Sequence, residues 1–560
     1  MAMSPPVSRK TRPTRAETTV WRRAPRRRVR RSQTPLTPRT PSPKRRTELQ
    51  PAGAMMAVDV LRRTAAALLV VAATGALIPE VQAAGFEVGE NTTRSLARGG
   101  TGAVNKADPS ALYFNPALLP RARGHQVLLN ANLLKLNLGF QRDDLVLRGR
   151  NETQTKSFGP VQNEGGWFPA PFLTASFDVG PENFALAVGA FGPSAYGRPC
   201  YGAMVDGECT FAPESPARGM LVSEDLFLAY FSLGAGYEFD LGPERSLAVG
   251  LTAIAAYQDT SFSIAVESDP NVSAPWSEDP RAEAYFRAED LQAWRPSAIV
   301  GVAYQDGPMR LAASYRPPIH WETKGKARVE LPAFLSSTGA YLTDDAMTFS
   351  TWQAGSLRLG WGVELGEHPA DAERSRFDLE VNAVWENWSL VEFFEIDIAG
   401  DIELADVPPD ENGNPPRIPI YPIYQVKNYQ DAYSLRVGAS YGINRFITAH
   451  GGAMMETPAQ RNAHTTVDFV SWERYGLSAG ASVHLPANLE LELGYMHIFS
   501  PDRQVRHGEI YNPIPMSQCA GPEFDHPGCD QPGTPPGNPQ NEGSWTASFQ
   551  LLSAGVTWRY

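Results

Sequence analysis

The sequence predicts an all-β protein whose strands form one antiparallel sheet, closed into a transmembrane barrel. Three observations lead to this prediction. Apolar and polar residues alternate strictly in many segments, the chain ends in such a segment on an aromatic residue, and the connections between segments are either long or very short. A closed barrel suits a membrane because it leaves no unpaired strand edge in the hydrocarbon.

The alternation is clearest between 489 and 495, where leucine or tyrosine occupies every odd position and glutamate or glycine every even one. Segments 377–385 and 435–441 repeat the pattern. The last strand, 550–560, places Leu552 to Tyr560 in one apolar row and ends on that tyrosine, as outer-membrane barrels do. We expect the apolar rows to face lipid and the polar rows to face the lumen.

The connections predict which ends of the strands lie together. Four are long and rich in Pro, Gly, Asn and acidic residues: 192–219, 269–288, 407–427 and 512–543. Others are tight, namely 240–245, 305–308 and 485–488. Long loops at one end and short turns at the other are typical of an outer-membrane barrel.

The first 83 residues differ from the rest in composition. Residues 1–54 carry 15 Lys and Arg against two acidic residues, which leaves 35 basic and 59 acidic residues in the remainder. This stretch predicts either a disordered basic extension, with a nucleic-acid-binding arm as one interpretation, or a mis-assigned translation start at Met55 or Met56. Residues 55–83 predict a signal peptide, with Arg62 and Arg63, a short apolar run and a cleavage site before Ala84.

Export to an oxidising compartment gives the four cysteines an interpretation. Cys200 with Cys209 and Cys519 with Cys529 form two local pairs in loop sequence, which predicts two disulfides. Neither pair has the spacing of a metal site, and His450, His464 and His497 show none either. The acidic turn 410–414 lacks the remainder of a calcium loop. We therefore predict no metal and no cofactor.

After these features, the order of short motifs resembles the long-chain fatty acid outer-membrane transporters (FadL-like), a family that also includes aromatic hydrocarbon transporters. The motifs follow the family's order, from the expected mature start to near the C-terminus: Ala84–Phe86, Ser95–Gly102, Asp108–Ala117, Gly189–Tyr196, Ala313–Pro317, Trp385–Trp388, Trp472–Ser478 and Gly494–Phe499.

The resemblance implies a 14-stranded barrel over 124–560, with residues 84–123 folded inside it as a hatch, or plug. Asn115, Pro116 and Ala117 form the family's most recognisable hatch motif. It also implies a kinked strand beside the hatch that lets cargo exit laterally, and the candidates for the kink are Gly189, Phe191, Gly192 and Pro193.

The implied function is passive uptake of long-chain fatty acids or other hydrophobic compounds by a monomer in the outer membrane. Partners are then the cargo, outer-membrane lipid and the barrel-assembly machinery, without nucleic acid. No phosphate-binding loop or energy-coupling motif is recognisable. Some family members place a basic residue on an early strand, but the corresponding stretch here reads Ala256-Tyr257-Gln258-Asp259. If the carboxylate anchor is missing, an uncharged hydrocarbon becomes the better cargo.

Ligand-binding candidates remain among the basic residues, because a carboxylate pairs best with Arg or Lys. They are Arg316, Arg436, Arg461 and Arg474, each of which could instead form a salt bridge in the lumen or at its rim.

Two other functions stay open. A general diffusion porin would have an open polar lumen without a hatch. A lipase would use Ser440 in Gly438-Ala-Ser-Tyr-Gly442, but this serine lies in the middle of a predicted strand rather than on a strand–turn–helix elbow. We therefore predict no enzymatic activity.

Overall fold

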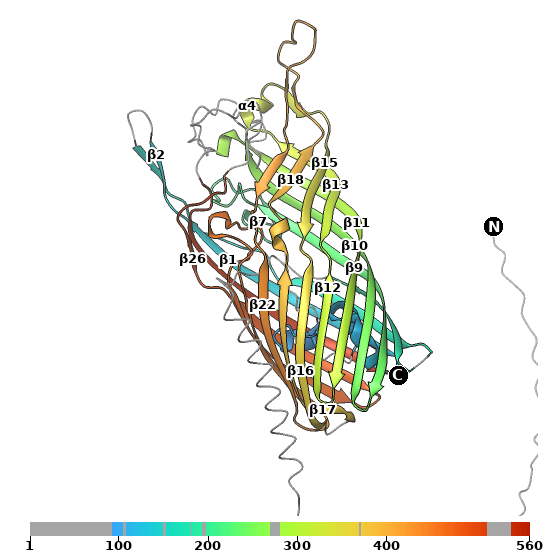
Figure 1. Ribbon diagram of the computed structural model, residues 1–560. Coiled ribbons are helices and arrows are strands. Elements are labelled where there is room, and N and C mark those ends of the chain that lie inside the picture. Colours follow the sequence, from blue (N-terminus) through green and yellow to red (C-terminus); the bar gives the residue numbers. More distant parts are fainter. Residues whose placement is uncertain are drawn as a thin grey trace, which may run out of the picture. The chain divides into compact units, whose positions relative to one another are not determined.

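The wall of the protein is a single antiparallel sheet that closes on itself (Figure 1). The computed structural model describes residues 92–104, 108–148, 153–180, 182–192, 198–268, 280–368, 371–511 and 539–560. The predicted basic extension, signal peptide, residues 84–91, Pro193, Cys519 and Cys529 lie outside them. Several hydrogen-bonded segments are the two halves of one wall strand interrupted by a kink, so the barrel has 14 strands, as predicted.

The wall strands are, in chain order, β1 (Gln126–Arg142), β5 (Phe168–Asp178), β6 (Phe184–Phe191), β9 (Ser223–Gly242), β10 (Arg245–Glu267), β11 (Glu283–Asp306), β12 with β13 (Met309–Arg316, Ile319–Glu330), β15 with β16 (Ala346–Gln353, Ser356–His368), β17 with β18 (Asp371–Glu386, Phe393–Ile398), β21 with β22 (Ile423–Val426, Ala432–Gly442), β23 (Ile447–Glu456), β24 (Arg474–Leu485), β25 with β26 (Leu489–Phe499, Arg503–Val505) and β27 (Gly543–Arg559).

Closure occurs where the last strand meets the first. β27 pairs with β1 from Gln126 opposite Arg559 to Arg142 opposite Gly543. The predicted polarity is confirmed there, because Leu552 and Trp558 are exposed on the outside while Ser553 is buried. On β25 the outward Leu493 is 66% exposed, while the glutamates on either side of Leu491 are buried in the lumen. On these two strands the apolar row therefore faces lipid.

The connections alternate between long and short around the barrel, as predicted. A short turn such as that between β11 and β12 uses Gly307 at φ +57°. Two predicted boundaries are wrong. Residues 283–288, expected in the connection 269–288, form the start of β11 and pair with β10. Residues 423–426, expected in the connection 407–427, form β21 and pair with β18. The wall continues beyond the lipid at the long-loop end, so its strands there can be polar outside and look like loop sequence.

Aromatic side chains mark where the lipid-facing surface ends. Phe227, Trp294 and Trp352 point outward and are exposed, and we call them the aromatic rim. Beyond the rim the outward residues are charged, such as Asp225 on β9 and Lys324 on β13. Side chains on the long-loop side of the rim therefore lie outside the membrane-spanning part of the wall.

Smaller elements decorate the long-loop end: β2 (Leu145–Arg148) with β3 (Thr153–Lys156), β4 (Val161–Gln162), β7 (Ala203–Val205) with β8 (Glu208–Thr210), β14 (Ala340–Leu342) with β19 (Ile402–Leu404) and β20 (Arg417–Ile418), α4 (Ala333–Ser336), η2 (Pro280–Ala282), η3 (Trp388–Leu390) and η4 (Asn462–His464). Among the described residues, none of the helices has the length and apolar character needed to cross a bilayer.

The described residues before β1 fold as three short helices inside the lower half of the barrel, α2 (Thr93–Ala97), α3 (Ala111–Phe114) and η1 (Pro116–Arg121) (Figure 1). We call residues 92–104 and 108–123 the plug. Helices this short are not stable alone, so the lumen must hold them in place. Almost every plug residue is buried, and α2 packs on β24 and β25 while η1 packs on β9 and β10.

Candidate functional site

The plug fits the barrel because wall residues facing it are small. A Cβ placed on Gly301 of β11 would lie 2.0 Å from Asn115 Oδ1, and one on Gly250 of β10 would lie 2.2 Å from the Pro116 carbonyl carbon. On the opposite wall, a Cβ on Gly452 would lie 2.2 Å from the Arg98 carbonyl carbon. Glycine is therefore required at these positions for the plug backbone to approach the wall.

The Asn115-Pro116-Ala117 motif ties the plug to β11. The Asn115 side chain accepts a hydrogen bond from Ala117 N (3.1 Å) and so caps η1, while its Nδ2 donates to Ala103 O (3.1 Å) and to Val302 O (3.3 Å). Pro116 occupies the first helical turn, where its missing N–H has no cost. One amide thus joins two parts of the plug to the wall.

Arg98 provides a second attachment. Its guanidinium forms ion pairs with Asp378 and Glu380 of β17 and donates to Ser440 Oγ of β22 at 2.7 Å. All these groups are buried. Buried ion pairs hold their geometry strictly, since removing one partner leaves an uncompensated charge.

Arg94 makes the equivalent attachment to β25. Its guanidinium pairs with Glu490 (2.7 Å), Glu492 and the plug's own Asp108 (3.4 Å). The alternating glutamates that predicted the strand therefore serve as counter-ions for the plug.

Ser440 does not have the surroundings of a nucleophile. Its Oγ lies 2.8 Å from His450 Nδ1, and His450 Nε2 lies 2.8 Å from Ser482 Oγ. However, Arg98 covers the same hydroxyl, and the serine sits within the uninterrupted β22 ladder rather than at a turn. The Ser–His contact is part of the hydrogen-bond network around the plug.

Above the plug lies a small cavity, which we call the lumen pocket. It has a volume of about 30 Å³, room for one or two water molecules. A larger guest must therefore displace lining side chains. Its lining includes four inward aromatic rings and five polar side chains: Trp321, Phe349, Phe394, Phe469, Glu224, Gln258, Thr260, Thr351 and Gln353.

Glu224 is the acidic group of the lumen pocket. It follows the inward row of β9, lies beyond the aromatic rim and is buried. Burial, reinforced by the nearby Asp468 carboxylate, raises the pKa of Glu224 to about 8, although Lys427 acts in the opposite direction. The Glu224 side chain is therefore mostly a neutral carboxylic acid at pH 7.

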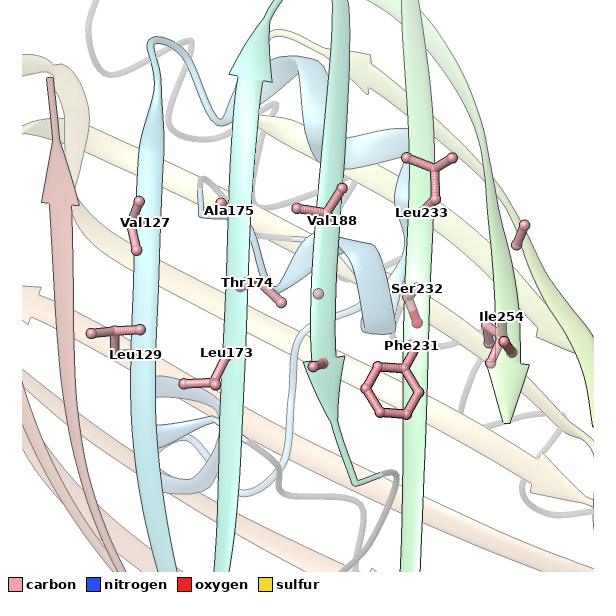
Figure 2. Close-up of a pocket in the computed structure, with 14 residues that line it drawn as sticks. Val127, Leu129, Leu173, Thr174, Ala175, Val188, Phe231, Ser232, Leu233 and Ile254 are labelled. Atoms are coloured by element: carbon pink, nitrogen blue, oxygen red, sulfur yellow. The ribbon is translucent and has the colours of Figure 1, made fainter. Parts of the chain in front are cut away.

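A second cavity lies on the outer face of the wall, at the level of the plug. It is a dent of about 770 Å³ formed by β1, β5, β6, β9 and β10 (Figure 2). Leu173 and Phe231 flank it, and the small residues Gly189 and Ala190 of β6 form its floor. We call it the wall dent.

Only the β6 backbone separates the wall dent from the plug. A Cβ on Gly189 would lie 2.9 Å from Leu112 Cδ2 of α3. In addition, Phe191 is the last residue of β6 that pairs with β9, although β9 extends on to Ser223. Gly189 thus lies between the wall dent and α3, and Phe191 and Gly192 lie where the β6–β9 pairing ends, while Pro193 lies outside the described residues.

The four arginine candidates lie in different surroundings in the structure. Arg436 and Arg474 both pair with Glu456 in the wall, and Arg461 is exposed beside η4. Arg316 alone is near the lumen pocket, where it donates to Tyr230 Oη and to Ala354 O (2.9 Å).

The structure assembles the lumen pocket from residues that the sequence did not single out. Glu224, Trp321, Phe349, Phe394 and Phe469 come from five separate segments, so no local motif reveals them. Of the pocket residues, Gln258 alone lies in a stretch that the sequence points to, where some family members have a basic residue. Strand alternation could have identified Glu224 as facing the lumen, but not its neighbours.

The predicted cysteine pairs are described in part. Cys200 and Cys209 form a disulfide that closes the β7–β8 hairpin. The described residues contain no cluster of three or more His, Cys, Asp or Glu side chains able to hold a metal ion.

The fold and this plugged lumen define a class of outer-membrane transport barrel. A family model, "Outer membrane protein transport protein (OMPP1/FadL/TodX)", matches residues 74–514, and the chain belongs to this family. The protein is therefore an outer-membrane β-barrel. No curated protein matches the chain by sequence.

Solved structures show the same fold at low identity. A Pseudomonas aeruginosa FadL homologue is similar with a TM-score of 0.62 at 16% identity, covering 85% of this chain and 100% of that one. The monoaromatic hydrocarbon channel CymD gives 0.53 at 15%, covering 85% and 99%. The Ralstonia pickettii toluene transporter TbuX gives 0.51 at 15%, covering 84% and 99%.

Proposed function

We propose that this protein is a passive channel for hydrophobic small molecules, which enter at the long-loop end, occupy the lumen pocket and leave sideways through the wall dent. The similar structures include a FadL homologue, a monoaromatic hydrocarbon channel and a toluene transporter, which supports cargo of this class. We further propose that it acts as a monomer, surrounded by outer-membrane lipid after insertion by the barrel-assembly machinery.

The observation that carries the proposal is the meeting of dent and plug at Gly189. An apolar hollow faces the lipid where α3 touches the inside of the same thin strand. Exit through the wall moves cargo from one apolar surface to another. An aqueous route would instead expose each CH₂ group at a cost of about 0.8 kcal/mol.

The pocket favours uncharged compounds over long-chain fatty acids. Among the described residues no basic side chain lines it, and Arg316 is engaged by Tyr230 and Ala354. A buried carboxylate without a cationic partner is strongly disfavoured.

The function can be tested by uptake into liposomes that contain the purified full chain. Oleate, an alkylbenzene and a small sugar serve as three probes. We expect protein-dependent uptake of the alkylbenzene, weaker uptake of oleate and none of the sugar. Sugar flux without alkylbenzene uptake would establish a porin, and lipid hydrolysis that is lost in Ser440→Ala would establish an enzyme.

The lateral exit needs a separate test. Ala190→Trp places a large ring on the floor of the wall dent, whereas Ala479→Trp places the same ring on the lipid face of β24. We expect Ala190→Trp to reduce the rate of alkylbenzene uptake at least about fivefold and Ala479→Trp to leave it unchanged. Equal rates in the two variants would rule out exit through this dent.

A further inference from the structure

The lumen pocket contains two side-chain atoms that its surroundings do not satisfy among the described residues, Glu224 Oε2 and Thr351 Oγ1. Glu224 is 9% exposed, and its Oε2 is buried without a hydrogen-bond partner among the described residues. Its neighbour Asp225 faces outward and pairs with Arg198 at 2.9 Å. A buried carboxyl oxygen without a partner is costly, so its presence indicates a group that a ligand can engage.

Three other polar side chains of the pocket, Gln258, Thr260 and Gln353, already have partners. Gln258 donates from Nε2 to Thr260 Oγ1 at 2.8 Å, and Gln353 Oε1 accepts from Trp321 Nε1 at 3.3 Å. Glu224 and Thr351 therefore differ from these three side chains, and of the two only Glu224 carries a carboxyl group.

The cation near Glu224, Lys427, is already paired with a carboxylate. Lys427 forms a buried ion pair with Asp468, and its ammonium lies 4.5 Å from the centroid of the Phe394 ring. With Glu224 in its acid form, the group of three carries no net charge. A ligand carboxylate would introduce an unpaired negative charge beside Asp468.

We propose that the lumen pocket selects hydrophobic molecules that carry an uncharged hydroxyl group, an aliphatic or aromatic alcohol, and that Glu224 is the residue that recognises the hydroxyl. A carboxylic acid both donates and accepts, as a hydroxyl does, so the two form a complementary pair. The aromatic rings hold the apolar body of the molecule. This inference rests on the proposed function and specifies its substrate class.

The test compares ligands that share one chain length. Radiolabelled decane, 1-decanol and decanoate are partitioned at pH 7 into phosphatidylcholine nanodiscs with and without the full chain, and the difference gives the protein-bound fraction. We expect decanol to bind about five- to tenfold more tightly than decane, the effect of one net hydrogen bond, and decanoate to bind more weakly than decanol.

Two variants and a matched control test whether Glu224 causes the tighter binding of decanol. Glu224→Leu should remove the advantage of decanol over decane while decane still binds, which also shows that the pocket is folded. Glu224→Gln should keep most of that advantage, because an amide also donates and accepts. Asp225→Asn, on the outward face of the same strand, should behave as wild type.

Other outcomes overturn the inference. A decanol advantage that survives in Glu224→Leu would show that another group recognises the hydroxyl. Decanoate binding as tight as that of decanol would show a carboxylate site. If alkylbenzene uptake into liposomes persists in either case, only this inference fails, whereas loss of protein-dependent uptake contradicts the proposed function itself.

Discussion

The two halves of the lumen are built in opposite ways. Around the plug, arginines meet paired carboxylates and glycines let backbones touch, as at Arg98 and Gly452. Around the lumen pocket, aromatic rings surround a little open space and Glu224 lacks a partner for Oε2. The first arrangement fixes one geometry, because buried charges and backbone contacts tolerate little displacement. The second can adapt, since rings can turn to admit a guest.

The proposed channel needs this difference in order to be closed to water and still pass apolar molecules. In that proposal, the plug blocks the axial route through directional contacts. The pocket and the wall dent have few such contacts, so movement there breaks fewer ion pairs and hydrogen bonds. We therefore expect substitutions around the plug to change closure and stability, and substitutions around the pocket to change selectivity.

The largest effect is expected for Arg98→Met. The change leaves Asp378 and Glu380 buried beside each other without their cation, which should cost about 3–5 kcal/mol. We expect a lower urea midpoint of unfolding in lipid and a new ion conductance in planar bilayers. Arg198→Met is the control, because its ion pair with Asp225 is exposed. An Arg98→Met variant with the wild-type urea midpoint and no new conductance would show that Arg98 does not hold the plug to β17.

A smaller effect is expected for Gly301→Ala. The new methyl group would lie 2.0 Å from Asn115 Oδ1, so the plug or β11 must shift, at a cost of about 1–3 kcal/mol. Gly451→Ala is the matched control, since the nearest atom to its Cβ is Ser478 O at 3.9 Å. Equal unfolding midpoints for both variants would show that the Asn115 contact does not matter.

The smallest effect concerns pH and the pocket. The raised pKa of Glu224 means that this group is neutral below about pH 8 and negative above it. Between pH 7 and pH 9 the binding ratio of decylammonium to decanoate should therefore rise, by about tenfold for one added charge. The groups that act on Glu224 are Asp468, Lys427 and Asp225. The ratio should stay flat in Glu224→Gln, and a flat ratio in wild type would contradict the assignment.

The sequence predicted the barrel well because strand polarity is a local property. The row from Leu552 to Tyr560 and the glutamates of β25 each reveal their faces without knowledge of neighbouring strands. The boundary at 283–288 was wrong because a wall strand beyond the lipid has polar outward residues, which resemble a loop.

The site was predictable only in part. Asn115 stands in a recognisable motif, but its partner Val302 follows a glycine far along the chain. The arginine candidates were chosen by charge alone, and only the register of the sheet shows that Arg436 and Arg474 share Glu456. Glu224 could not be predicted as a binding residue, because that role depends on the absence of a hydrogen-bond partner for its Oε2 among the described residues.

If cargo leaves through the wall beside α3, as proposed, α2 can stay in place during transport. Ala97→Cys with Gly494→Cys can test it, since the two Cβ positions lie 3.4 Å apart, close to disulfide range. Alkylbenzene uptake into liposomes is measured after oxidation and after reduction, with wild type taken through the same cycle. We expect rates within about twofold of each other in both states. Uptake that is abolished by oxidation and restored by reduction would show that cargo passes where α2 stands, and would contradict the proposed exit beside α3.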